Sequence, residues 1–224
     1  MGLIITKYGM LLLRAMGQTL LLALLGLFFA CIIGLVVGLM SVLRNRACRV
    51  IAQVFVDVIR GVPMIVLAYF IYFGVPYFLN NMLRFDITLS ALQAGTICLA
   101  LNCGAYMAEI IRAGIESIDK GHMEAGRSLG LNYLQTMKEI IVPQAIKNIL
   151  PALGNEFIVL IKETSVAGVI AVTDLTKAAQ YVGSATWRIL PPLYVAAGCY
   201  LIMVLGLTKL LNIFERRLAQ GDHN

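Results

Sequence analysis

Residues Ala15–Leu43 read AMGQTLLLALLGLFFACIIGLVVGLMSVL, and this stretch alone assigns the 224-residue chain to the membrane. It contains no charged side chain, and about 20 apolar residues are enough for a helix to cross a bilayer. The whole chain has the same character, since 60% of its residues are hydrophobic and only 13% are charged. Soluble domains carry about 25% charged residues. The composition therefore excludes a soluble globule and a disordered chain, and it predicts an integral membrane protein.

Further apolar runs follow the first one, and they are continuous and rich in Leu and Ile. A transmembrane barrel would instead show alternating segments of about 10 residues, so we expect an all-α fold. The weakest run is the fourth, because Glu156, Lys162 and Glu163 interrupt it. We expect a single domain, residues 1–224, with five transmembrane helices at about 17–43, 52–80, 88–114, 148–173 and 190–213.

The charged residues give the orientation. The net charge is +6, but the basic residues sit in short segments between apolar runs, which does not indicate a nucleic-acid partner. Most of the Lys and Arg in the loops fall on the side that also carries the carboxy terminus. Positively charged loops stay in the cytoplasm. We therefore expect the amino terminus outside and the carboxy terminus in the cytoplasm.

One polar segment, about residues 119–145, separates the third and fourth expected spans. We predict two short helices there. The first, Met123–Leu129, ends at Gly130, since glycine is the usual residue after a helix. The second, Tyr133–Ile141, is capped by Asn132 and stops before Pro143. We expect this helix pair to form a knob and not a pocket.

The same segment carries a spaced motif. Glu124, Ala125 and Gly126 are followed by Gly130, and then by Ile140 and Pro143. This pattern resembles the cytoplasmic motif E-A-A-x3-G-x9-I-x-L-P of bacterial ABC importer permeases. The sequence departs from that motif by Gly126 in place of Ala and by Val142 in place of Leu, and we interpret both changes as conservative in size.

Other stretches resemble one branch of that family, the polar amino-acid permeases of the histidine/glutamine/arginine type. The resemblance covers essentially the whole chain, and the family has five spans with the amino terminus outside. The matching stretches are Gly17–Leu20 (GQTL), Arg60–Pro63 (RGVP), Ala105–Arg112 (AYMAEIIR), Pro151–Asn155 (PALGN) and Lys162–Ser165 (KETS).

The resemblance implies a function. The polar segment would be a coupling helix that docks on a cytoplasmic ATPase, and transport would follow alternating access in the bacterial inner membrane. Two ATPase subunits, which hold ATP and Mg²⁺, a second permease subunit (identical or related) and an extracytoplasmic amino-acid-binding protein would complete the importer. This chain would be no enzyme and would bind no cofactor, and its cysteines and histidines suggest no metal site. Glu124 would either favour the amino end of its helix or contact a basic residue of the ATPase.

Polar residues within the expected spans suggest a substrate path. Asn102, Tyr106 and Glu109 share one helix face, as do Asn155 and Lys162, with Glu163 beside them. Together they offer the cation and the acid that a zwitterionic amino acid requires. Charges within a span cost about 2.5–3.5 kcal/mol each, so such residues face protein or water.

Structural roles compete with this interpretation. Lys162 would pair with Glu109 or with Glu156 to hold the bundle together, and Asp57 with Arg60 forms a second candidate pair. Glycines in the first span would allow close helix packing; they are Gly26, Gly34 and Gly38.

The main alternative function is an ion-coupled secondary transporter of small polar solutes. Such transporters contain inverted repeats, and we find no repeat in this sequence. A structural membrane anchor is a further alternative, but it needs no charges within its spans. Both alternatives leave the motif from Glu124 to Pro143 without a role.

Overall fold

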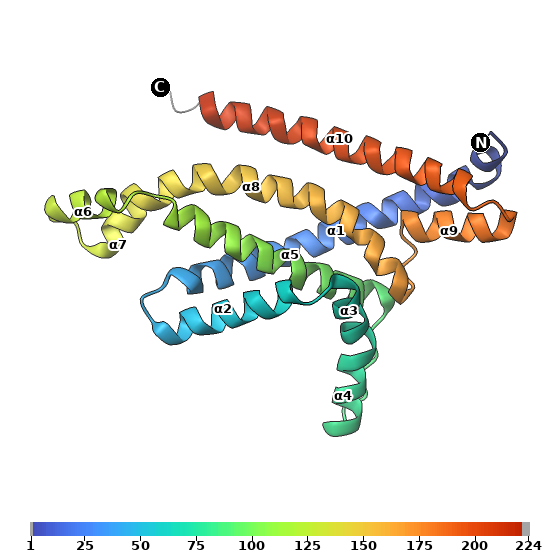
Figure 1. Ribbon diagram of the computed structural model, residues 1–224, viewed down its shortest axis with the longest axis horizontal. Coiled ribbons are helices and arrows are strands. Elements are labelled where there is room, and N and C mark those ends of the chain that lie inside the picture. Colours follow the sequence, from blue (N-terminus) through green and yellow to red (C-terminus); the bar gives the residue numbers. More distant parts are fainter. Residues whose placement is uncertain (1, 221–224) are drawn as a thin grey trace.

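A computed structural model describes residues 2–220, and its secondary structure there is helical, as predicted. Four long helices run along the length of the molecule (Figure 1). They are α1 (Gly2–Val42), α5 (Ala91–Glu116), α8 (Val142–Glu163) and α10 (Leu190–Gln220). The predicted fourth span, 148–173, is not one regular helix. Helix α8 ends at Glu163 and passes into the 3-10 helix η3 (Thr164–Ile170).

The predicted second span, 52–80, is wrong as a single helix. Helix α2 (Arg46–Gly61) ends before Pro63, and Val62 is extended, with φ −96° and ψ 131°. The ring of a proline disfavours helical backbone at the preceding residue, which explains the break. The chain then changes direction through α3 (Met64–Tyr69) and the π-helix η1 (Phe70–Gly74), which still contribute Leu67, Ala68 and Ile71 to the core. Helix α4 (Val75–Met82), which has no buried residue, projects from the bundle (Figure 1).

Four helical stretches of the described chain are long and apolar enough to cross a membrane: Thr6–Val42, Met64–Met82, Ala91–Glu116 and Leu190–Ile213. Helix α8 is not among them. It carries Lys147, Asn155 and Glu156, which lower its mean hydropathy. The five-span count therefore stays a prediction that depends on α8.

The core lies where α1 packs along α5, and it is closed by α8 and η3. The predicted glycine seam is confirmed. A methyl group added at Gly34 would place its Cβ 2.6 Å from the Cβ of Met107, and the corresponding distances to α5 are 3.0 Å at Gly26 and 2.9 Å at Gly38. The two helices approach this closely only because these positions have no side chain.

The two ends of the bundle differ. At one end lie α6 (Lys120–Ser128), α7 (Tyr133–Thr136) and the π-helix η2 (Met137–Ile141). At the other end α9 (Leu175–Thr186) lies beside the first residues of α1 (Figure 1). Asp174 caps α9 and accepts a hydrogen bond from the Tyr200 hydroxyl at 3.0 Å. The Leu175 N–H donates to Thr19 Oγ1 at 3.0 Å, so α9 is tied to both α1 and α10.

Candidate functional site

Residues 119–141, here called the knob, contain most of the predicted motif. Helix α6 begins at Lys120, three positions before the predicted start, because Asp119 caps it. The Gly121 N–H donates to Asp119 Oδ1 at 2.6 Å. Glu124 therefore lies beyond the first turn, where the helix dipole gives an acid little stabilisation. Its predicted role at the helix start is wrong, and its side chain is exposed.

The predicted turn at Gly130 is confirmed. Gly130 has φ +88°, a conformation that side-chain-bearing residues rarely adopt. Its N–H donates to the Arg127 carbonyl at 3.0 Å, and the Leu131 N–H donates to the Gly126 carbonyl at 3.2 Å. These are the two hydrogen bonds of a Schellman motif, which satisfies the last carbonyls of α6.

The predicted cap at Asn132 is also confirmed. The Gln135 N–H donates to Asn132 Oδ1 at 3.0 Å, and the Asn132 N–H donates to Gln135 Oε1 at 2.9 Å. This reciprocal pair is a capping box. The α6–α7 turn is thus fixed from both sides by local hydrogen bonds.

The predicted stop before Pro143 is wrong. The chain passes from α7 through η2 into α8 with helical backbone throughout. The Val142 N–H donates to the Met137 carbonyl, five residues earlier, so the helix widens by one residue just before the proline. Proline has no N–H to donate within a helix, and a π-turn of this kind lets the helix continue past it. The backbone of the knob is therefore continuous with that of α8.

Gly126 packs against η2 and α7, and our interpretation of its replacement of alanine as conservative in size is wrong. It is buried, and an added Cβ would lie 2.6 Å from Thr136 Cγ2 and 3.1 Å from Ile140 Cδ1. The Thr136 hydroxyl donates to the Asn132 carbonyl at 3.0 Å, which fixes the orientation of that side chain. An alanine at position 126 requires Thr136 to move.

The other motif residues differ in how far their side chains are exposed to solvent. Glu124, Ala125, Gly130 and Pro143 are exposed, whereas Ile140 is half-buried. Sequence reasoning missed two leucines on either side of the turn. Leu129 is 81% exposed and Leu134 is 75% exposed, and both lie outside the candidate spans. The sequence held no clear signal for them, because the same segment contains other apolar residues that the structure buries or half-buries, such as Leu131, Met137 and Ile141.

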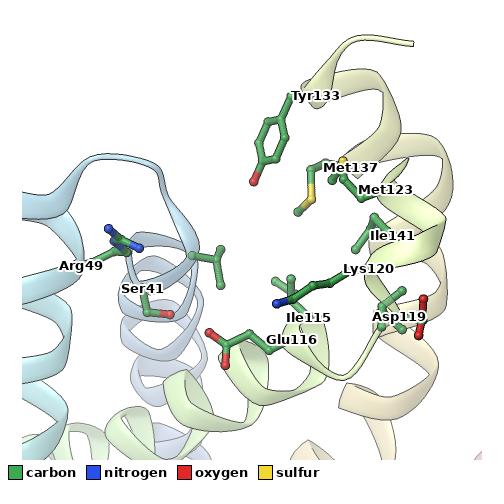
Figure 2. Close-up of a pocket in the computed structure, with 12 residues that line it drawn as sticks. Ser41, Arg49, Ile115, Glu116, Asp119, Lys120, Met123, Tyr133, Met137 and Ile141 are labelled. Carbon is green, nitrogen blue, oxygen red and sulfur yellow. The ribbon is translucent and has the colours of Figure 1, made fainter. Parts of the chain in front are cut away.

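The knob also forms one wall of a pocket, contrary to our expectation. A cavity of about 560 Å³ separates it from the neighbouring ends of α1, α2 and α5 (Figure 2). The Arg44 guanidinium lies 4.5 Å from the centre of the Tyr133 ring. This cation–π contact links the α1–α2 turn to α7.

The predicted substrate path is partly brought together. Asn102 of α5 is buried, and its Nδ2 donates to Glu163 Oε2 of α8 at 3.1 Å. The Met64 sulfur lies 4.0 Å from the same amide nitrogen. Tyr106, on the same face of α5, has the Arg60 guanidinium 4.8 Å from its ring centre. Asn155, in contrast, is exposed.

The predicted structural ion pairs are wrong. Glu109 binds Arg112 within its own helix, with 2.6 Å between Oε1 and Nη2, and Arg112 also contacts Glu116. Lys162 is exposed and forms no ion pair with a described residue, so it joins neither Glu109 nor Glu156. The ion-pair partner of Glu109 therefore comes from the next turn of α5 and not from another helix.

Asp57 is also satisfied locally, since it accepts a hydrogen bond from Gln53 at 2.9 Å. Arg60 lies over Tyr106 instead and forms no ion pair with any residue that the structure describes. Arg60 thereby connects the end of α2 to the polar face of α5.

Comparison with known proteins identifies the family to which this chain is similar. The family described as "Binding-protein-dependent transport system inner membrane component" matches residues 26–220. A putative glutamine transport system permease protein of Rickettsia bellii is 40% identical over 194 residues, which are 87% of this chain and 86% of that protein. The arginine transport system permease protein ArtQ of Bacillus subtilis is 38% identical over 94% of this chain and 93% of its own length.

A solved structure agrees. The crystal structure of an amino acid ABC transporter with histidines contains a chain that is 41% identical, with a TM-score of 0.87. The match covers 96% of this chain and 97% of that chain. The chain described here therefore belongs to the family of inner-membrane components of binding-protein-dependent transport systems, as its motif from Glu124 to Pro143 predicted.

Proposed function

We propose that this chain is the permease subunit of an ATP-driven ABC importer that moves polar amino acids into the cytoplasm by alternating access. The observation that carries the proposal is the knob, which exposes Glu124, Leu129 and Leu134 outside the candidate spans and continues into α8. The names of relatives that handle glutamine and arginine support the substrate class.

The proposed assembly has two permease subunits, identical or related, and two cytoplasmic ABC ATPase subunits. An extracytoplasmic binding protein delivers the amino acid. ATP and Mg²⁺ bind to the ATPases, and this chain holds no cofactor. The proposed topology has five spans, with α8 as the fourth, the amino terminus outside and the carboxy terminus inside. It is supported by the basic residues in and beside the knob, among them Arg44, Arg49 and Lys120.

The knob is the proposed contact with the ATPase. Leu129 and Leu134 are the apolar anchors of this contact, because exposed leucines in water gain by burial in a partner's groove. Glu124 supplies a charge for a basic residue on the ATPase. Gly126 and Ile140 pack inside the knob and keep it rigid, so that it moves as a lever with α8.

The proposed substrate path lies between α5 and α8 and includes Asn102, Tyr106, Glu109, Asn155, Lys162 and Glu163. Asn102 and Glu163 form its centre, since their hydrogen bond joins the two helices. The Glu163 carboxylate is an acceptor for the ammonium of an amino acid. Lys162, which has no ion-pair partner among the described residues, supplies a cation for the carboxylate.

The test is reconstitution in proteoliposomes with the ATPase and the binding protein, and ATP hydrolysis is measured with a panel of amino acids. We expect one polar amino acid to stimulate hydrolysis. Glu124→Lys should abolish that stimulation, whereas the matched control Glu139→Lys, an exposed acid of the same knob, should retain it. Glu163→Ala should change the concentration of amino acid that is needed. Uptake that follows a proton or sodium gradient without any ATPase would contradict the proposal and favour a secondary transporter.

A further inference from the structure

The cavity beside the knob has no role in the transport function proposed above. Its volume of about 560 Å³ is within the range of small-molecule sites, about 300–1,000 Å³. We propose that it binds a phosphate group carried on an apolar chain, as in an anionic phospholipid. The charges, the apolar wall and the depth of the cavity each support this assignment.

Two cationic side chains line the cavity, and neither is paired with an acidic side chain of the protein. Arg49 of α2 and Lys120 of α6 face it from opposite sides (Figure 2). Neither side chain has an ion pair or a hydrogen bond with any residue that the structure describes. Two separated cations of this kind suit the several oxygens of one phosphate, and Arg in particular binds phosphate with parallel N–H donors.

Two acids also line the cavity, but both are already engaged. Glu116 forms an ion pair with Arg112. Asp119 Oδ1 accepts the Gly121 N–H at 2.6 Å, and its carboxylate points away from the opening in Figure 2. The lining side chains therefore sum to no net formal charge, but the two whose charges are not engaged in a contact, Arg49 and Lys120, are both cations and favour an anionic group.

The remaining wall is apolar. Met123, Met137 and Ile141 come from α6 and η2 and line the side formed by the knob. Thioether side chains are flexible and adapt to apolar chains of irregular shape. A free phosphate ion makes no use of this wall, whereas an acyl chain covers it.

The depth of the cavity fits a lipid. Two of the candidate spans end at its lining, one at Val42 and the other at Glu116. The cavity therefore lies at the ends of two candidate membrane-spanning helices, and the proposal places the lipid headgroup at this level. Basic pockets between transmembrane helices on the cytoplasmic side bind anionic headgroups in other membrane proteins. A lipid held by Arg49 and Lys120 ties α2 to the knob, as the Arg44–Tyr133 contact does.

The test measures lipid binding to the full chain purified in detergent, by native mass spectrometry during titration with phosphatidylglycerol or phosphatidylcholine. We expect phosphatidylglycerol to bind more tightly. Arg49→Ala combined with Lys120→Ala should weaken its binding about 30-fold, which corresponds to about 2 kcal/mol. The matched control, Arg127→Ala with Lys138→Ala, removes two exposed cations of the same knob outside the cavity and should change binding by less than about twofold.

Further measurements distinguish the binding of a lipid from the binding of a free phosphate ion. Met137→Gln makes the apolar wall more polar, so it should weaken the binding of phosphatidylglycerol. Competition by inorganic phosphate for the cavity should stay unchanged. The proposal is overturned if inorganic phosphate binds as tightly as phosphatidylglycerol, if the two lipids bind equally, or if the control pair loses as much binding as the cavity pair.

Discussion

The seam between α1 and α5 and the contact between α6 and α7–η2 use the same device in different surroundings. In both, a glycine brings two helical segments so close that an added Cβ would lie 2.6 Å from a neighbouring carbon, that of Met107 for Gly34 and of Thr136 for Gly126. The seam lies within long apolar helices. The knob is a short segment whose own hydrogen bonds set its shape. Close packing thus builds the body in one region and holds the short helices of the knob together in the other.

The largest expected effect is on the seam. Gly34→Val should lower the free energy of unfolding by about 3 kcal/mol, because Met107 lies in the core and has no free space to move into. Unfolding in detergent, followed by circular dichroism, measures it. Gly17→Val is the control on the same helix, since no atom lies within 4 Å of its added Cβ. Equal losses for both variants would refute the close-packing explanation.

The next effect is on docking. Leu129→Asp with Leu134→Asp should weaken binding of the ATPase by about 2 kcal/mol or more, because two apolar anchors are lost. The stability of the permease should stay within about 0.5 kcal/mol, since both positions are exposed. Co-purification with the ATPase measures binding. Lys138→Asp, at an exposed position of the knob, changes the charge by the same two units and serves as the control. If the control weakens binding as much, charge and not apolar contact determines docking.

Gly126→Ala tests the packing inside the knob. We expect a loss of about 1 kcal/mol in stability, because overpacking against Thr136 outweighs the better helix propensity of alanine. Adding Thr136→Ser removes the crowded methyl group but keeps the hydroxyl that donates to Asn132, so it should restore most of the loss. A double-mutant cycle on unfolding free energies measures this coupling. Additive losses would exclude the proposed contact.

The smallest effect concerns the cap alone. Asn132→Ala should cost about 1 kcal/mol, since it leaves an N–H of α7 without an acceptor. Hydrogen exchange at the Gln135 amide should rise while exchange in the core of α5 stays unchanged. Unchanged exchange at Gln135 would show that tertiary packing, and not the capping box, holds the α6–α7 turn.

Apart from the glycine seam, the features that the sequence predicted correctly are local ones. The apolar run Ala15–Leu43, the turn at Gly130 and the cap at Asn132 each depend on residues a few positions apart, so neighbours along the chain fix them. The predictions for Glu124 and Pro143 were wrong because they depended on where a helix starts or stops. Asp119 moved the start of α6, and a π-turn carried the helix past the proline.

Only the tertiary structure decided which side chains meet across helices. The hydrogen bond between Asn102 and Glu163, the fit of Gly126 to Thr136 and the cavity between Arg49 and Lys120 all join segments whose relative positions depend on how helices cross. Helical periodicity gives the face on which a residue lies, but not what packs against that face. The sequence by itself therefore determined the class of protein, its family motif and its turns, whereas packing between helices determined its contacts and its sites.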